Sequence, residues 1–152
     1  MSRVRASIDV PGLASEAEAL WYDTSRWPTF IDGLHHVARL EGDWPHAGAR
    51  VLWDSNPGGR GRVQERVLDF VAREGQTVAI EDEKIHGTQR VGFSPTATGV
   101  TVSLELRYTL KQSRPGIAIF DLLFVRRPQR EALQRTLRRF RTEVAAERQG
   151  SV

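Results

Sequence analysis

The stretch from Pro115 to Arg148 constrains the fold most, because its pattern predicts one long helix at the end of a chain of strands. Its first part, residues 117–125, is apolar except for Asp121, whereas the part from residue 126 onward is rich in arginine. The strands before this helix cannot close a core alone. We therefore expect them to wrap around the helix and to leave a pocket between the two.

The segments before this helix alternate between apolar and polar residues, as half-buried strands do. The clearest case is Val100–Leu110, in which every second residue is apolar or aromatic. Short turns with glycine connect the strands, so neighbouring strands should be antiparallel. Seven strands are expected, over residues 4–10, 36–40, 49–54, 62–72, 77–82, 86–94 and 100–110.

Two short helices are expected after the first strand. Leu13–Thr24 has apolar residues at helical spacings, with acidic residues in its early turns where they suit the helix dipole. Pro28 disfavours helical geometry at Trp27. A second short helix should therefore begin near Pro28 and stop at Gly33.

These elements predict an α+β domain. A curved, seven-stranded antiparallel sheet wraps around the long C-terminal helix, with two short helices after the first strand. The 152 residues are expected to form one domain, with a tail that frays from about residue 147.

Three segments carry a resemblance to a known family: Asp23–Phe30, the turn from Gly42 to Ala49, and Phe93–Val102. By the order and spacing of these three segments, the chain resembles the START and birch-pollen-allergen (SRPBCC) superfamily, whose architecture is the helix-grip fold. Within it, the chain looks like the bacterial polyketide cyclase/dehydrase and lipid transport group. The resemblance covers nearly the whole chain and implies an internal cavity for a small hydrophobic or amphipathic molecule.

Strand parity points Glu65 into the pocket, because Val63 and Val67 on the same strand face that way. A carboxyl group buried there could have a raised pKa and act as an acid or base on a bound ketone or hydroxyl group. Tyr108 also faces inward, and these two residues are the candidate catalytic groups. The alternative is that Glu65 forms a structural salt bridge with an arginine and that Tyr108 is satisfied within the protein.

The expected cavity has walls from the sheet, the short helices and the long helix. Gln89 faces inward by parity, and Arg126 and Arg130 fall on the inward face of the long helix. The two arginines would clamp an anionic group of the ligand, or else pack by their stems with their heads in water. The expected cavity residues are Trp21, Trp27, Phe30, Trp53, Glu65, Gln89, Phe93, Tyr108, Leu123, Arg126 and Arg130.

Pro128 predicts a kink in the long helix, because it lacks the N–H that would bond to the carbonyl of Phe124. The part before the proline should then be an adjustable wall at the entrance of the pocket. A kink would turn Phe124 and Val125 inward. The alternative is that these two residues form the contact surface of a homodimer.

The composition argues against several classes of site. There is no cysteine, which excludes disulfides and thiolate chemistry. The four histidines lack metal-ligand spacing, so we expect neither a metal nor a cofactor. The net charge of +3 mixes both signs, so nucleic acid is not an expected partner. With no signal-peptide pattern and no apolar run of about 20 residues, we expect a cytoplasmic protein without an integral membrane segment.

The sequence thus predicts a protein that binds a small hydrophobic or amphipathic molecule, lipid-like or polyketide-like, between the sheet and the C-terminal helix. The alternative is an aromatase-like enzyme of the cyclase or dehydratase type, which would use polar cavity residues as acid and base. A weaker alternative is an interaction protein that uses the basic helix.

Overall fold

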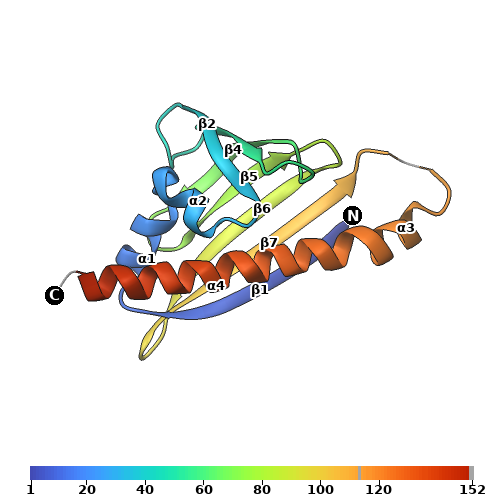
Figure 1. The fold of residues 1–152 in the computed structure, drawn as a ribbon. Helices are drawn as coiled ribbons and strands as arrows, with labels where there is room; N and C mark the ends of the chain where they lie inside the picture. The colour runs from blue at the N-terminus through green and yellow to red at the C-terminus, as the bar shows by residue number, and fades with distance from the viewer. Residues whose placement is uncertain (113, 151–152) are drawn as a thin grey trace.

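The computed structural model describes residues 1–112 and 114–150, and it shows one curved sheet with a long helix lying across it (Figure 1). The strand order is β1-β7-β6-β5-β4-β3-β2, and every neighbouring pair is antiparallel. The seven expected strands are confirmed. They are β1 (Ser2–Pro11), β2 (Leu34–Glu41), β3 (Arg50–Ser55), β4 (Arg62–Val71), β5 (Gly75–Glu81), β6 (Ile85–Pro95) and β7 (Gly99–Leu110).

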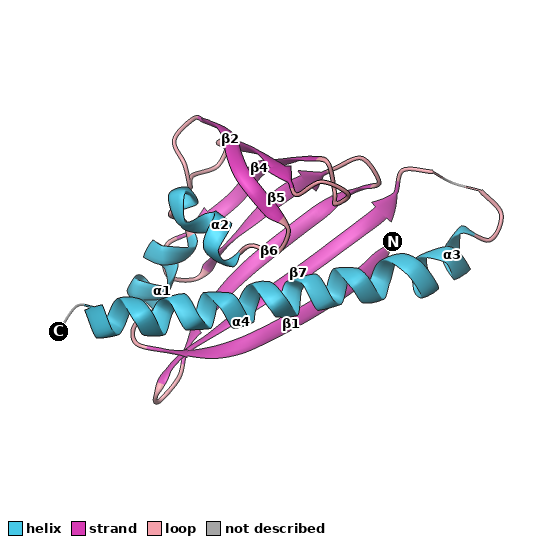
Figure 2. Cartoon of the chain, in the orientation of Figure 1, coloured by secondary structure: helices cyan, strands magenta, loops and turns pink. Residues whose placement is uncertain are grey.

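The helices lie together on one face of the sheet (Figure 2). Three short helical segments follow β1: α1 (Ala14–Trp21), the 3-10 turn η1 (Thr24–Arg26) and α2 (Trp27–Phe30). The C-terminal helix consists of α3 (Ile117–Phe120), η2 (Asp121–Val125) and α4 (Arg126–Gly150). The predicted helix-grip architecture is therefore confirmed.

The second short helix begins one residue earlier than the sequence predicts. Trp27 is itself helical, with φ −53° and ψ −39°. Its backbone N–H bonds to the carbonyl of Thr24, and its indole N–H donates to the carbonyl of Trp21 at 2.8 Å. These two bonds outweigh the preference of a residue before proline for extended geometry.

The core lies between the concave face of the sheet and the helices. From α4, the apolar residues Leu133, Leu137, Phe140 and Val144 are buried at helical spacings. Phe140 meets the rings of α1 and α2, since its centroid lies 5.3 Å from that of Trp21 and 5.2 Å from that of Phe30. This aromatic cluster fixes the second half of the long helix against both short helices.

The irregular part of the long helix lies before Pro128 and not at it. Asp121–Val125 forms a π-helical turn, in which the N–H of Arg126 bonds to the carbonyl of Asp121 five residues earlier. Pro128 follows shortly after this turn, in a helix that is continuous from α3 to α4, and it lacks the N–H that a regular helix would bond to the carbonyl of Phe124. The irregularity of the helix thus lies a few residues before Pro128, and an adjustable wall at this place stays a prediction.

The first part of the long helix does not line the core. Leu123 and Phe124 are exposed, whereas Val125, the last residue of this part, is partly buried and packs against the core. The prediction that a kink turns Phe124 inward is therefore wrong. The physical reason is that the face toward the strand ends is taken by Asp121, which bonds to Ser2 of β1 and Tyr108 of β7, while the helix runs on past the end of the sheet (Figure 1).

At its other end, α4 continues to Gly150, and fraying from about residue 147 stays a prediction. Arg148 donates to Glu16 of α1 at 2.9 Å, and Glu147 accepts a bond from Arg26 of η1. The last two residues of the expected frayed tail lie outside the described part of the chain. Among the described residues, no helix combines the length and the apolar character needed to cross a bilayer.

Candidate functional site

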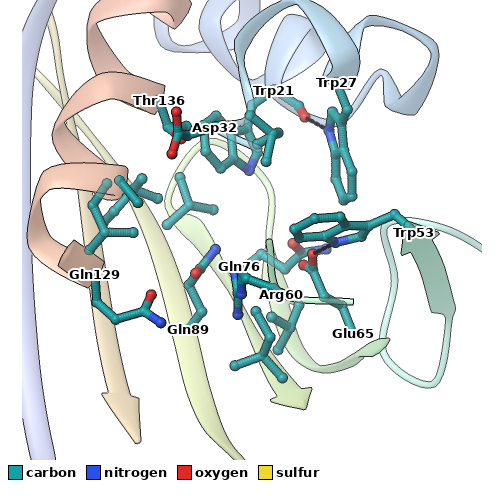
Figure 3. Close-up of a pocket in the computed structure, with 17 residues that line it drawn as sticks. Trp21, Trp27, Asp32, Trp53, Arg60, Glu65, Gln76, Gln89, Gln129 and Thr136 are labelled. Carbon is teal, nitrogen blue, oxygen red and sulfur yellow. Dashed lines mark hydrogen bonds between the residues drawn. The ribbon is translucent and has the colours of Figure 1, made fainter. Parts of the chain in front are cut away.

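A pocket lies between the concave face of the sheet, the short helices and α4 (Figure 3). Ten of its 17 lining residues are apolar, with aromatic rings from Trp21, Trp27 and Trp53, and the other seven are polar or charged. Polar side chains enter from the strands, from α4 and from the loop between β3 and β4. The lining residues are Trp21, Trp27, Ile31, Asp32, Trp53, Arg60, Glu65, Gln76, Val78, Ile80, Gln89, Val91, Leu104, Gln129, Ala132, Leu133 and Thr136.

The enclosed part of this pocket is small. The enclosed cavity measures about 40 Å³, although the empty space including its open mouth is about 660 Å³. One buried water occupies roughly 10–15 Å³. The enclosed part therefore has room for little more than a few water molecules, and a larger ligand must extend through the mouth or displace wall side chains.

Glu65 is the acidic group at the centre of the site. Parity along β4 turns it inward with Val63 and Val67, and all three side chains are buried. The indole N–H of Trp53, on the adjacent strand β3, donates to Glu65 Oε2 at 2.7 Å. Burial raises the pKa of the Glu65 carboxyl group, while the hydrogen bond from Trp53 and the charge of Arg60 lower it in part. The site therefore makes ionisation of this carboxyl group less favourable than in water.

Arg60 places a cation beside this acid. Its guanidinium carbon lies 5.5 Å from the centre of the Trp53 ring, and its Nε donates to Asp82 Oδ2 at 2.7 Å. Asp82 is itself fixed, because its other oxygen accepts from the backbone N–H groups of Lys84 and Ile85. Nη2 of Arg60 is buried and has no hydrogen-bond partner among the described residues. A buried donor without a partner is uncommon in native proteins.

Three glutamines add neutral hydrogen-bonding groups to the pocket. Gln76 is held in place, because its side-chain nitrogen donates to the carbonyl of Pro45 at 3.0 Å. Gln89 of β6 and Gln129 of α4 extend into the same space from opposite walls (Figure 3). An amide group can both donate and accept, so these side chains suit hydroxyl and carbonyl oxygens of a ligand.

Asp32, which follows α2, fixes the wall of the pocket that α4 forms to the short helices. Its carboxylate accepts two bonds from Arg135, at 3.0 and 3.1 Å, and one from Arg139 at 3.1 Å. Its backbone N–H donates to the hydroxyl of Thr136 at 2.9 Å. These contacts fix the distance between the short helices and the part of α4 that covers the pocket.

The structure brings together five of the predicted cavity residues: Trp21, Trp27, Trp53, Glu65 and Gln89 all line the pocket. Two other predicted residues are buried in the core beside it. Phe30 packs between the rings of Trp21 and Phe140, and Phe93 lies against Tyr22.

The remaining four predicted residues lie elsewhere. Leu123 and Arg130 are exposed to solvent, and Arg126 and Tyr108 meet near the N-terminal end of β1. Neither Arg126 nor Arg130 pairs with Glu65. Sequence periodicity misplaced them because it assumed a regular helix with the sheet beneath its whole length.

Tyr108 belongs to a second polar cluster around Asp121. The Tyr108 hydroxyl donates to Asp121 Oδ1 at 2.5 Å, and the hydroxyl of Ser2 donates to Oδ2 of the same carboxylate. Nη2 of Arg126 lies 3.5 Å from Oδ2. Burial, together with the neighbouring Asp121 carboxylate, raises the pKa of Tyr108. The structure thus separates the two candidate catalytic groups, because Tyr108 does not line the pocket that holds Glu65.

Several lining residues were missed by the sequence analysis, although some left a signal. Gln76 shares the parity of the inward residues Val78 and Ile80. Gln129 and Thr136 lie four residues before and three residues after the inward Leu133, so the helical period could have found them. Arg60 lies in a loop, where no periodicity predicts the direction of a side chain.

The described residues hold no group of three or more histidine, aspartate or glutamate side chains arranged to bind a metal ion. A larger hollow, of about 560 Å³, lies on the outer face of the sheet between charged strand residues. Its lining is that of an ordinary solvated sheet face, so we regard the inner pocket as the candidate site.

Solved structures of other proteins share this fold. A protein from Thermus thermophilus is 20% identical with a TM-score of 0.76, over 96% of this chain and 99% of that one. A START superfamily protein from Mycobacterium smegmatis is 13% identical with a TM-score of 0.73, over 95% and 97%. The di-domain ARO/CYC StfQ from the steffimycin biosynthetic pathway is 18% identical with a TM-score of 0.75. That match covers 97% of this chain and 51% of StfQ.

At these identities, the likeness to solved structures concerns the fold alone. Among curated proteins, none is similar enough to this chain to count as a match. The family described as polyketide cyclase / dehydrase and lipid transport matches residues 1–145, which include every strand and most of α4. The chain therefore belongs to the polyketide cyclase/dehydrase and lipid transport family.

Proposed function

We propose that this protein binds a small amphipathic molecule, lipid-like or polyketide-like, in the pocket between the sheet and α4. The observation that carries the proposal is the pair formed by the buried acid Glu65 and the unpartnered Nη2 of Arg60 within walls that are otherwise mainly apolar. Apolar pockets with a few convergent polar groups and a perturbed pKa are typical of ligand sites. Membership of the family supports the same conclusion.

The polar groups specify how such a ligand would lie. Arg60 Nη2 can donate only, so it would bind a carbonyl, carboxylate or phenolate oxygen. Protonated Glu65 and the amides of Gln89 and Gln129 would bind further oxygens of the ligand. The apolar body would lie against the three tryptophan rings and would extend toward the mouth, because the enclosed space is small.

Tryptophan fluorescence offers a direct test, since three of the four tryptophans line the pocket. We expect saturable changes in emission on titration with a medium-chain fatty acid or a hydroxylated anthraquinone. Trp44 does not line the pocket, so Trp44→Phe should preserve the response. The absence of a saturable response to either ligand class would overturn the proposal.

Arg60→Gln tests whether the pocket recognises the oxygen atoms of the ligand or binds apolar molecules in general. For a carboxylic acid ligand we expect a loss of affinity of about ten- to a hundredfold, because a hydrogen bond to a charged group contributes roughly 1.5–3 kcal/mol. The methyl ester of the same acid should bind the variant and the wild type more nearly alike. Equal losses for acid and ester would instead indicate a general disturbance of the pocket.

A second candidate function is proton transfer to a bound polyketide-like substrate, as in a cyclase or dehydratase. The raised pKa of Glu65 favours this candidate, since a raised pKa extends the pH range over which a carboxyl group holds the proton that a general acid donates. Tyr108 is not available as its partner, so Arg60 is the neighbouring group that could stabilise an enolate oxygen.

Measuring product formation alongside ligand binding distinguishes an enzyme from a protein that only binds the ligand. With a poly-β-ketone thioester mimic, an enzyme should form a cyclised or dehydrated product that Glu65→Gln abolishes while ligand binding persists. A binding protein would show no such product with either form.

A further inference from the structure

The first part of the C-terminal helix presents a group of exposed apolar side chains. Within α3 and η2, only Asp121 is buried. We call the exposed group the apolar tip; its members are between 43% and 65% exposed. They are Ile119, Phe120, Leu122, Leu123 and Phe124. The tip is the orange part of the helix in Figure 1, where it runs beyond the sheet near the N-terminus.

The apolar tip is broader than the stripe by which a helix fits a protein groove. Of the six consecutive residues 119–124, only Asp121 is buried, so the five exposed apolar side chains spread over more than half of the helix circumference. An amphipathic helix that packs on protein usually shows an apolar stripe of roughly 100° or somewhat more. Apolar residues on so many sides of a helix fit an apolar environment that contacts the helix on several sides, such as the boundary between head groups and acyl chains of a bilayer.

Aromatic rings strengthen this comparison. The rings of Phe120 and Phe124 lie side by side on the tip, with centroids 5.2 Å apart. Together with the leucines they form a compact apolar wedge. Wedges of Phe and Leu beside basic residues are the usual means by which a helix inserts its apolar face into the surface of a bilayer.

Positive charge surrounds the apolar tip. Asp121 is the only acidic residue between residues 111 and 130, and it is buried against Tyr108 and Ser2. Arg114 and Arg130 are exposed and have no acidic partner in the described part of the chain. We call the basic residues on either side of the tip the basic collar; they are Lys111, Arg114, Arg126, Arg127 and Arg130. Lys111, Arg126 and Arg127 also pair with Glu81, Asp121 and Glu131, so Arg114 and Arg130 supply the charge that no acidic side chain offsets in the described part of the chain.

We propose that the apolar tip and the basic collar form a docking site for an anionic phospholipid surface. The tip would enter the boundary between head groups and acyl chains, and the collar would lie against the phosphates. The protein would then be peripheral to the bilayer, held by a short helix segment and by charge. The contacts of Asp121 with Ser2 and Tyr108 fix the tip to the ends of β1 and β7.

Vesicle flotation tests this proposal with the full chain. We expect the wild type to float with phosphatidylcholine vesicles that contain phosphatidylglycerol, and to bind pure phosphatidylcholine about tenfold or more weakly. Replacing Leu122, Leu123 and Phe124 together by serine should reduce binding to the anionic vesicles by at least about tenfold. Arg127→Gln combined with Arg130→Gln should remove much of the preference for anionic lipid.

The chain offers a matched control. Leu40 and Leu68 are also exposed leucines, at 46% and 43%, but they lie on β2 and β4 away from the tip. Replacing both by serine should leave vesicle binding unchanged. Arg60→Gln should also bind vesicles as the wild type does, so a failure of the pocket proposal stays distinct from a failure of this one.

Three outcomes would overturn the docking proposal. The wild type could fail to float with anionic vesicles, or the triple serine variant could float as well as the wild type. In the third, sedimentation velocity would find a wild-type dimer that the triple serine variant dissociates, without vesicle binding by the wild type. The tip would then be the interface of a homodimer.

Discussion

The indole N–H of Trp53 donates to Glu65 Oε2 at 2.7 Å, across the neighbouring strands β3 and β4. Both side chains are buried on the concave face of the sheet. A tryptophan can satisfy one carboxylate oxygen but cannot neutralise its charge, so the hydrogen bond does not remove the cost of ionising a buried acid. This relationship explains why the pKa of Glu65 is raised despite a good hydrogen bond.

Glu65→Gln should stabilise the protein increasingly as the pH rises. The folded-state pKa of Glu65 lies above its unfolded value, so the native state holds the proton more tightly. The wild type therefore has its full stability below an unfolded pKa of about 4.3 and loses stability as the pH rises above it. Urea unfolding of both proteins at about pH 4 and about pH 7 measures the difference. A difference that stays constant over this range would contradict the account.

Tyr108→Phe should destabilise the protein by about 1–3 kcal/mol, because it removes a hydrogen bond to the buried carboxylate of Asp121. Tyr22→Phe is the matched control. The Tyr22 hydroxyl is buried without a hydrogen-bond partner among the described residues, so its removal should be nearly neutral or stabilising. Urea unfolding compares the two variants, and equal losses would show that the bond to Asp121 is not responsible.

Asp32→Asn should lower the free energy of unfolding by about 1 kcal/mol, because Asp32 joins Arg135 and Arg139 of α4 to the loop after α2. The pairs are partly exposed, so the loss should shrink at high salt. Glu131→Gln breaks the more exposed pair with Arg127 and should cost at most about 0.5 kcal/mol. If both variants lost the same amount at low salt, Asp32 would have no special role in holding α4.

Strand parity predicted the sheet and its inward polar residues well, because the alternation of side chains along a strand is strict. Glu65 and Gln89 reach the pocket for this reason. The first part of the C-terminal helix was predicted poorly, since a helical face has meaning only where a partner surface lies beside it. The π-helical turn at Asp121–Val125 also breaks the regular period of about 3.6 residues per turn.

Asp121 was the informative exception within an apolar run. The sequence analysis assigned no partner to Asp121, because Asp121 and Tyr108, which bond in the structure, lie on elements whose relative placement the sequence does not define. The same limit applies to Arg60. The direction of the Arg60 side chain depends on the loop between β3 and β4 and on its bond to Asp82 in the turn between β5 and β6. Neither segment has a repeating pattern that the sequence could reveal.

Native mass spectrometry of gently purified protein, followed by denaturing identification of any retained molecule, tests the central claim most directly. The account predicts an added mass of an amphipathic small molecule on the wild type. Ala132→Phe, which fills the pocket from α4, should lose this mass, whereas Ala118→Phe on the exposed surface of α3 should retain it. Occupancy that is equal in all three proteins, or absent from the wild type even after incubation with fatty acids and aromatic polyketides, would contradict the account.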